Sequence, residues 1–374
     1  MTDKLCLLPW IHLEADSTGT ARPCCMWKGP PVGDFNTQNV DDVWHGKPMQ
    51  LLREQFLAGD APSSCDNCWS AERAGLNSKR QNDLARFAHH SNKPWEALAK
   101  PVYLDLKLGN ICNIKCRICS SDYSFKWRED EIKLYGAAKN TQDPAWVDPS
   151  ASFWTNLADN LDHLEFIDLT GGEPFLVKPM WRLLEQCVEQ GVAHKISLHY
   201  NTNGTILPTP TQRKLWTHFK WVETMFSIDG IGAKFEYLRN PARWTKVDRT
   251  LGVLQQEAVT HTSICYTVNA YNVWDIPEFE AYAQSEYAIT PYWNLLHGPA
   301  HYSIKNLPEH AKLEIATKIK KYPSIVKYMC DTTCDSQAHA QFKQHTAKLD
   351  SIRKETFAHA FPELHRILTH ERSR

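Results

Sequence analysis

The feature that most constrains this chain is the alternation of short apolar runs with amphipathic stretches between residues 102 and 296. The apolar runs are Val102–Leu108, Leu164–Leu169, Lys195–Tyr200, Val222–Ile228, Ser263–Val268 and Tyr292–Leu296. The amphipathic stretches include Pro179–Gln190, Thr211–Phe219, Val247–Ala258 and Pro277–Ser285. Strands that alternate with helices along a chain form parallel sheets joined by right-handed crossovers. Six such strands predict an α/β fold built as an incomplete barrel.

Three cysteines follow the first apolar run within eight residues. They are Cys112, Cys116 and Cys119, in the order Cys-Asn-Ile-Lys-Cys-Arg-Ile-Cys. Thiolates are the usual protein ligands of iron–sulfur clusters, and three of them would hold three irons of a [4Fe-4S] cube and leave the fourth iron open. Zinc knuckles also use closely spaced cysteines but prefer four ligands, and the next cysteine here is Cys187. The spacing therefore favours a cluster with one open iron.

A second motif, Gly171-Gly172-Glu173, follows the second apolar run. Its glycines let the backbone approach a ligand closely, and its glutamate can accept a hydrogen bond from an ammonium group. Together with the cysteine triad, this order resembles the radical S-adenosylmethionine (SAM) superfamily. The resemblance implies a partial (β/α)6 TIM-like barrel in which the amine and carboxylate of SAM bind the open iron. It further implies that Glu173 holds the amine and that the reduced cluster cleaves SAM to a 5′-deoxyadenosyl radical.

Polar residues recur where the later apolar runs end, and catalytic groups in such barrels gather at these strand ends. By the resemblance, Asn203, Ser227 and Asp229 would line the ribose and methionine of SAM, although Asn, Asp and Gly can also simply turn the chain. Arg239 would pair with the carboxylate of SAM or with substrate, since a guanidinium group suits carboxylates; the alternative is a surface arginine. Ile118 stands where the superfamily commonly has an aromatic residue, and its backbone would seat the adenine.

The amino-terminal segment carries a second set of cysteines. Residues 4–70 resemble the SPASM/twitch auxiliary-cluster module, which usually follows the barrel and here precedes it. The resemblance implies that one auxiliary [4Fe-4S] cluster is bound by Cys6, Cys24, Cys65 and Cys68. Cys25 competes with Cys24 for this role, and the spacing from the preceding glycine favours Cys24. A zinc ion held by four cysteines would satisfy the same spacing.

The composition excludes several classes of protein. Lys and Arg number 42 against 43 Asp and Glu, a net charge of −1, which supplies no strong basic field for nucleic acid. No apolar run approaches the roughly 18 to 20 residues of a membrane span. The apolar stretch at the start of the chain is too short for a secretory signal. We expect a cytoplasmic protein, in which twelve cysteines indicate metal or redox chemistry rather than disulfides.

Three regions of different pattern predict three domains. Residues 1–90 would form the auxiliary-cluster module, residues 95–305 the radical SAM partial barrel, and residues 306–374 a helical carboxyl-terminal extension. In the last region, Cys330 and Cys334 would lie one turn apart in a helix. They could bind a metal or donate a hydrogen atom to a substrate radical, but thiols without such a role are expected.

The resemblance implies an enzyme that abstracts hydrogen from a substrate by means of the 5′-deoxyadenosyl radical. With an auxiliary cluster to accept an electron, the expected outcome is net oxidation or crosslinking of a peptide, a protein or a small molecule. A flavodoxin- or ferredoxin-type protein would supply the reductant. The alternatives are an epimerase or sugar-modifying radical SAM enzyme, and a non-catalytic electron-transfer or zinc-binding protein.

Overall fold

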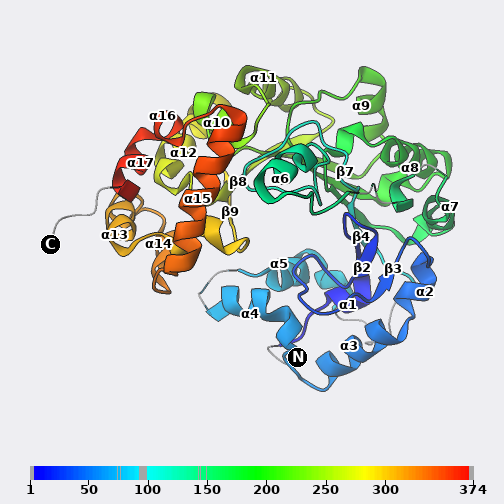
Figure 1. Cartoon of the computed structure of the whole chain (residues 1–374). Helices are drawn as coiled ribbons and strands as arrows, with labels where there is room; N and C mark the ends of the chain where they lie inside the picture. The colour runs from blue at the N-terminus through cyan, green and yellow to red at the C-terminus, as the bar shows by residue number, and fades with distance from the viewer. Residues whose placement is uncertain are drawn as a thin grey trace. The chain divides into compact units, whose positions relative to one another are not determined.

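The computed structural model describes residues 4–73, 75, 77–91, 99–141, 143, 145–148 and 150–369 (Figure 1). Contacts divide the chain into two compact units. The first unit comprises Met1–Ile111, Gln142–Asn201 and Pro208–Glu223, and the second comprises Cys112–Thr141, Thr202–Leu207 and Thr224–Arg374. No helix among the described residues is long and apolar enough to cross a membrane.

The first unit is built on strands in the order β3-β2-β1-β4-β5-β6. The strand bounds are β1 His12–Ala15, β2 Thr20–Arg22, β3 Gly33–Asp34, β4 Tyr103–Lys107, β5 Phe166–Thr170 and β6 Ser197–Thr202, whose last residue belongs to the second unit. Strands β1, β2 and β3 pair antiparallel, whereas β1 pairs parallel with β4, β4 with β5, and β5 with β6. The amino-terminal segment therefore extends the parallel sheet by one strand.

Helices of the first unit follow the sequence signals for helix starts. They are α1 Leu8–Ile11, α2 Val40–Trp44, α3 Lys47–Leu57, α4 Asp66–Arg73, α5 Lys79–Arg86, α7 Ser152–Ala158, α8 Lys178–Glu189 and α9 Pro210–Trp216. Capping boxes begin α2 at Asn39, α5 at Ser78 and α9 at Thr209, which satisfies backbone donors that a helix leaves free at its start. Helix α8 presents its buried residues, among them Met180, Leu184 and Cys187, on one side.

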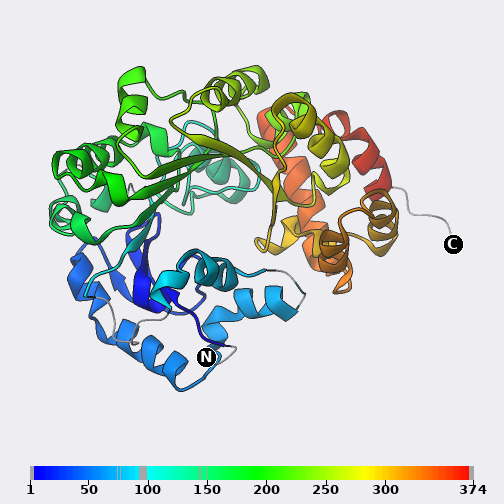
Figure 2. The same cartoon turned by 180° about the vertical axis from the view of Figure 1, so that it is seen from behind.

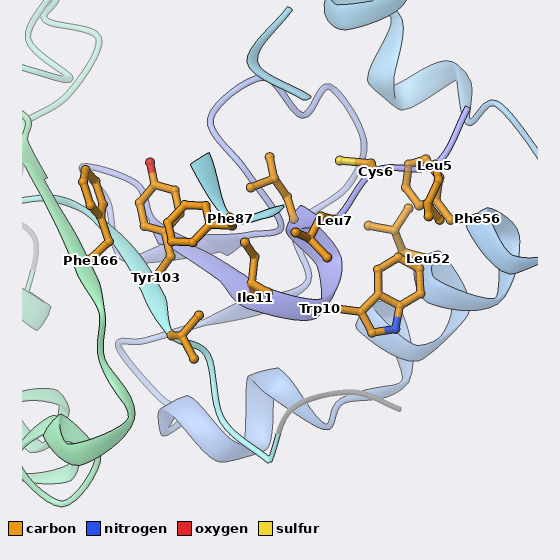
Figure 3. Close-up of a cluster of buried hydrophobic side chains, with 12 residues drawn as sticks. Leu5, Cys6, Leu7, Trp10, Ile11, Leu52, Phe56, Phe87, Tyr103 and Phe166 are labelled. Atoms are coloured by element: carbon orange, nitrogen blue, oxygen red, sulfur yellow. The ribbon is translucent and has the colours of Figure 1, made fainter. Parts of the chain in front are cut away.

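A cluster of buried apolar side chains joins the amino-terminal segment to the sheet in the first unit. Its members are Leu5, Cys6, Leu7, Leu8, Trp10, Ile11, Leu52, Phe56, Phe87, Val102, Tyr103 and Phe166. They come from α1 and the segment before it, from α3, from the residue that follows α5, and from β4, the residue before it, and β5; ten of them are labelled in Figure 3. Burial of this apolar surface fixes the segment that carries Cys6 against the first predicted strand.

The second unit contains the cysteine triad and the carboxyl-terminal helices. Its strands are the later part of β7 (Trp221–Ser227), β8 (His261–Val268) and β9 (Tyr292–Leu295), and β8 pairs parallel with β9. Its helices are α6 Trp127–Tyr135, α10 Gly232–Leu238, α11 Trp244–Gln255, α12 Ile276–Tyr287, α13 Glu309–Lys318, α14 Pro323–Cys330, α15 Ser336–Arg353, α16 Phe357–Ala360 and α17 Pro362–Thr369. The last five helices, α13 to α17, lie together in both views (Figure 1 and Figure 2).

The predicted α/β class with a parallel sheet is confirmed, and each of the six predicted strands is present. The helical character predicted after residue 306 is also observed, although α14 ends at Cys330 and Cys334 lies beyond it. These two cysteines are therefore not on one continuous helix. The predicted boundaries at residues 90, 95, 305 and 306 stay predictions.

Candidate functional site

The three cysteines of the triad lie on an irregular loop in the second unit, between β4 and α6. Cys112 is buried, and Cys119 packs against Trp127 and Leu349. Burial raises the pKa of the Cys119 thiol, and the charges of Cys116 and Cys112 raise it further, so the three sulfurs lie within electrostatic reach of one another. Thiolates in such surroundings need a positive partner. The donor set fits an iron–sulfur cluster, whose irons would provide that partner.

Two polar side chains of the second unit point at the sulfurs. The Asn203 amide nitrogen lies 3.7 Å from Cys112 Sγ, and the Arg239 Nη1 atom lies 3.7 Å from Cys116 Sγ. Hydrogen bonds to ligand sulfurs are one way in which a protein sets the reduction potential of a cluster. From the sequence we predicted that Asn203 and Arg239 lie near SAM. In the structure both side chains lie beside the cysteines of the triad.

Arg239 is a buried residue and not part of the surface. Its Nη2 atom lies 2.7 Å from Asp229 Oδ2, and Asp229 also accepts a hydrogen bond from the Thr267 backbone at 2.9 Å. Because this guanidinium already pairs with Asp229 and faces Cys116, the structure favours a role beside the cluster over pairing with a free carboxylate.

Asn203 also belongs to a small hydrogen-bonded network that fixes the beginning of the cysteine loop. Its side-chain oxygen accepts from the Thr205 backbone and hydroxyl at 2.9 and 2.6 Å, and its amide donates to Asn113 at 3.1 Å. Asn113 in turn donates to Thr205 at 2.8 Å. Neither Asn113 nor Thr205 was predicted from the sequence, although the position of Asn113 directly after Cys112 was a usable signal.

The Gly-Gly-Glu turn follows β5 in the first unit. Gly172 has φ +43°, and a Cβ atom at this position would lie 2.4 Å from the carbonyl oxygen of Ile111. The Glu173 backbone donates to that same carbonyl at 2.8 Å, and Glu173 is fully buried. Ile111 directly precedes Cys112 in the chain. Only glycine permits this close approach of the turn to the residue from which the cysteine loop starts.

We expect a Gly172→Ala variant to be destabilised more than a Gly136→Ala variant. Both glycines have positive φ, but a Cβ at Gly136 would meet nothing within 4 Å. Each alanine incurs roughly 1 to 2 kcal/mol for left-handed backbone, and only Gly172→Ala adds an overpacking cost of about 1 to 3 kcal/mol. Chemical unfolding of both variants measures the difference, and equal losses would contradict the steric argument.

Two further predicted SAM contacts lie in the second unit. Ser227 is the last residue of β7, and Ile118 lies on the loop between Cys116 and Cys119; both side chains are half-buried. Their proposed contacts with ribose and adenine stay predictions.

The amino-terminal cysteines converge in the first unit. Cys6 and Cys68 are buried, and Cys24 and Cys65 pack against the apolar cluster that contains Cys6. Burial raises the pKa of the Cys6 thiol, and Cys65 and Cys68 raise it further, while Cys6 acts in the same direction on Cys24. Figure 3 shows the Cys6 side chain at the edge of that cluster. Cys6 thus lies within electrostatic reach of Cys24, Cys65 and Cys68, and four thiols gathered in this way fit a closed metal centre.

Cys25 has different neighbours from Cys24. It keeps an exposed surface, but its thiol lies among charged groups, and burial raises its pKa to about 12. The charges that act most on it belong to Lys79, Asp105, Lys107 and Glu14. Geometry thus supports Cys24 as the partner of Cys6.

We expect a Cys24→Ser variant to lose about four irons per chain relative to the parent, because one corner of the auxiliary centre loses its thiolate. Cys25→Ser is the matched control and should keep its iron. Iron and sulfide analysis after anaerobic reconstitution measures both. Loss of iron from Cys25→Ser with retention in Cys24→Ser would reverse the assignment.

His12 holds the segment that leads to Cys24. The ring is fully buried, its Nδ1 atom lies 2.8 Å from the Pro23 carbonyl oxygen, and it meets Tyr103 edge-on at 4.2 Å. Burial lowers the pKa of His12 from 6.5 to about 4. The unfolded chain therefore takes up a proton near pH 6.5, whereas the folded chain resists it down to pH 4.

The stabilising effect of neutral His12 is accordingly present above pH 6.5. It is lost progressively as the pH falls from 6.5 to the folded pKa of about 4. A pKa difference of this size corresponds to about 3 kcal/mol. We expect the fall in the free energy of unfolding between pH 7 and pH 4 to be smaller by that amount in a His12→Asn variant. Urea titrations at several pH values measure it. A His218→Asn variant, at an exposed histidine, should leave the pH dependence unchanged, and equal behaviour of the two variants would contradict the prediction.

Comparison with known proteins bears on the amino-terminal segment first. Residues 6–69 match the family model of the SPASM iron-sulfur cluster-binding domain, which agrees with the predicted range of residues 4–70. No curated protein matches the chain.

Several solved structures are similar at low identity. SuiB from Streptococcus suis bound to S-adenosylmethionine is 15% identical, with a TM-score of 0.41, and the match covers 77% of this chain and 62% of that chain. A histidine-tagged anSMEcpe with bound AdoMet is 18% identical, with a TM-score of 0.43 and coverages of 59% and 57%. SuiB bound to the precursor peptide SuiA is 13% identical, with a TM-score of 0.41 and coverages of 87% and 71%.

The chain spans about three fifths of the length of the first two of these structures, and TM-scores of this size do not by themselves carry an activity from one protein to another. The match over residues 6–69 stands independently of them, and the four converging thiols lie within it. Residues 6–69 of this chain are therefore similar to the SPASM iron-sulfur cluster-binding domain.

Proposed function

We propose that this chain is a radical SAM enzyme with an auxiliary iron–sulfur cluster. The observation that carries the proposal is the set of three sulfurs at Cys112, Cys116 and Cys119, with the side chains of Asn203 and Arg239 directed at two of them. Three thiolates leave one iron of a [4Fe-4S] cube for a ligand that is not a protein side chain. When bound, the cluster supplies the electron that reductively cleaves SAM to methionine and a 5′-deoxyadenosyl radical.

The residues of the chain position the reactants in this proposal. Glu173 would hold the amino group of SAM, since a buried carboxylate favours a cationic partner. Arg239 would stabilise negative charge on Cys116 while Asp229 keeps its guanidinium in place. Asn203 would fix the start of the cysteine loop through Asn113. Chemistry of this kind belongs to the cofactor, and the protein orients the substrate and excludes water.

The finer reaction is proposed as a net oxidation or crosslink. Cys6, Cys24, Cys65 and Cys68 of residues 6–69 would hold the auxiliary cluster, which would supply an acceptor for the electron that a net oxidation removes from the substrate. The proposed substrate is a peptide or protein segment; a precursor peptide, SuiA, is what SuiB binds in one of the structures compared above.

Formation of 5′-deoxyadenosine tests the proposal. The full chain is reconstituted with iron and sulfide without air, reduced with dithionite, mixed with SAM and examined by chromatography. The proposal expects 5′-deoxyadenosine and methionine in equal amounts. Iron bound at both sites with no 5′-deoxyadenosine would leave a two-cluster electron-transfer protein, and zinc in place of iron would leave a zinc-binding protein.

A further inference from the structure

Four ionisable residues lie side by side across four parallel strands of the first unit. The register pairs Glu14 of β1 with Asp105 of β4, Asp105 with Asp168 of β5, and Asp168 with His199 of β6. We call these four residues the polar row. Residues in register on neighbouring strands point to the same side of a sheet. Parallel strands are normally apolar on both faces, so a row of this kind indicates a function.

The polar row contains carboxylate oxygens without a partner. Glu14 and Asp105 are each only 2% exposed. One oxygen of Glu14 contacts Lys107, but the other has no hydrogen-bond partner in the described part of the chain, and the same holds for one oxygen each of Asp105 and Asp168. The other oxygen of Asp105 lies 3.9 Å from Lys107, and that of Asp168 accepts from Tyr103 at 3.5 Å. A buried acceptor that makes no hydrogen bond is destabilising, and a bound ligand would offset that cost.

The charges around the row do not balance. Glu223 lies 3.0 Å from the ring of His199 and adds a fourth carboxylate to those of Glu14, Asp105 and Asp168. Against these four stand Lys107, His199 and Arg86, which lies over the Phe166 ring and acts on His199, since Lys79 lies 3.0 Å from Asp83 and pairs there. One negative charge is therefore left over. In agreement, burial raises the pKa of Asp168 to about 6 and that of Glu14 to about 7, with Asp105 adding to both shifts.

The spacing of the row suits an organic cation better than a metal ion. Neighbouring strands lie about 4.8 Å apart, so carboxylates on three strands spread over about twice that distance. Among the described residues, the only three potential metal ligands with donor atoms within 4.8 Å of one another are His89, His90 and Glu165. A group with several N–H donors, an ammonium or a guanidinium, can reach carboxylates that are separated in this way.

Asp168 and His199, at one end of the row, keep partly exposed surfaces, whereas Glu14 and Asp105 are covered. A ligand would therefore meet Asp168 before it meets Asp105. We propose that the polar row binds a cationic group of the substrate, an ammonium or guanidinium, with Asp105 and Asp168 as its acceptors. The inference rests on the proposed function and deepens it, because it assigns a charge to the part of the substrate that enters the first unit.

Binding of small probes tests the inference without any turnover. The probes are N-acetyl-lysine methylamide and N-acetyl-arginine methylamide, with N-acetyl-norleucine methylamide as the uncharged analogue, and calorimetry is performed on the full chain at pH 8. At least one cationic probe should bind saturably and at least tenfold more tightly than the norleucine analogue. Asp105→Asn should weaken that binding about tenfold, whereas Asp60→Asn, at an exposed carboxylate, should leave it unchanged.

Each other outcome has a definite meaning. Equal binding of charged and uncharged probes, no binding of any probe, or full binding by Asp105→Asn overturns the inference. Binding of magnesium chloride that depends on Asp105, with no binding of the cationic probes, would replace it with a metal site. If circular dichroism shows Asp105→Asn to be unfolded, Asp168→Asn, at the more exposed acceptor, takes its place. Production of 5′-deoxyadenosine is scored separately, so failure of the probes and failure of the proposed function are distinguishable.

Discussion

A Cys116→Ala variant, reconstituted without air, is expected to hold about four irons per chain where the parent holds about eight, and to form no 5′-deoxyadenosine. The sulfur of Cys116 is the one that faces Arg239 at 3.7 Å, and it raises the pKa of Cys119 through its charge. Without it, two thiolates remain for a cube that needs three. Iron analysis and chromatography of the reaction mixture measure the two effects independently.

Two variants control for damage elsewhere. Cys330→Ala removes an exposed thiol at the end of α14 and should change neither iron content nor 5′-deoxyadenosine. Cys65→Ala removes a proposed ligand of the auxiliary centre and should retain some SAM cleavage that is not coupled to substrate. Full iron and undiminished cleavage in Cys116→Ala would show that the triad is not the cluster site.

The sequence predicted the parts of the fold that depend on local chemistry. Each apolar run with β-forming residues became a strand, from β4 at Tyr103–Lys107 to β9 at Tyr292–Leu295. A turn at Gly171-Gly172 that approaches a ligand was also predicted from its glycines, whereas the neighbour that Gly172 approaches in the structure is the backbone of Ile111. The convergence of Cys6 with Cys65 and Cys68 could be predicted only through the resemblance to the SPASM/twitch module, because Cys65 lies 59 positions after Cys6 in the chain.

Contacts that depend on register or on distant partners escaped prediction. Alternation in β4 places Asp105 and Lys107 on one side of a strand, but it does not say that Asp168 lies beside Asp105. The polar row became visible only with the pairing of four strands. Arg239 raised a similar problem, because a guanidinium ten residues from Asp229 in sequence can equally face solvent. The parallel pairing of β1 with β4 was also not predicted, because residues 4–70 were interpreted only through their resemblance to the SPASM/twitch module.

Arg117 is the clearest case of a residue that sequence alone could not interpret. It lies between Cys116 and Cys119, is fully buried, and stacks on the Tyr237 ring at 3.5 Å. Its guanidinium pairs with Asp350 of α15 and, at 2.7 Å, with Glu355 just beyond that helix. The partners are more than 230 residues away in the chain. The cysteine loop is therefore fixed to the carboxyl-terminal helices by a side chain that itself binds no metal.

Replacing this side chain should lower the stability of the second unit strongly. In Arg117→Ala, Asp350 and Glu355 lose their common partner, and breaking a buried ion pair in this way costs about 3 to 5 kcal/mol. Guanidinium chloride titration measures the loss. Arg243→Ala is the matched control, because Arg243 pairs with Glu236 at 2.9 Å but is 77% exposed, and pairs of that kind contribute about 1 kcal/mol or less.

A second measurement separates fixation of the loop from general stability. Under conditions where Arg117→Ala is still folded, its triad should take up iron more slowly and release it faster to a chelator than the parent, because the loop has lost its anchor on α15. Arg117→Lys keeps one charge but cannot reach both carboxylates with a planar fork, and it should fall between the two. Equal losses of stability in Arg117→Ala and Arg243→Ala, or unchanged release of iron, would mean that the carboxyl-terminal helices do not support the cysteine loop.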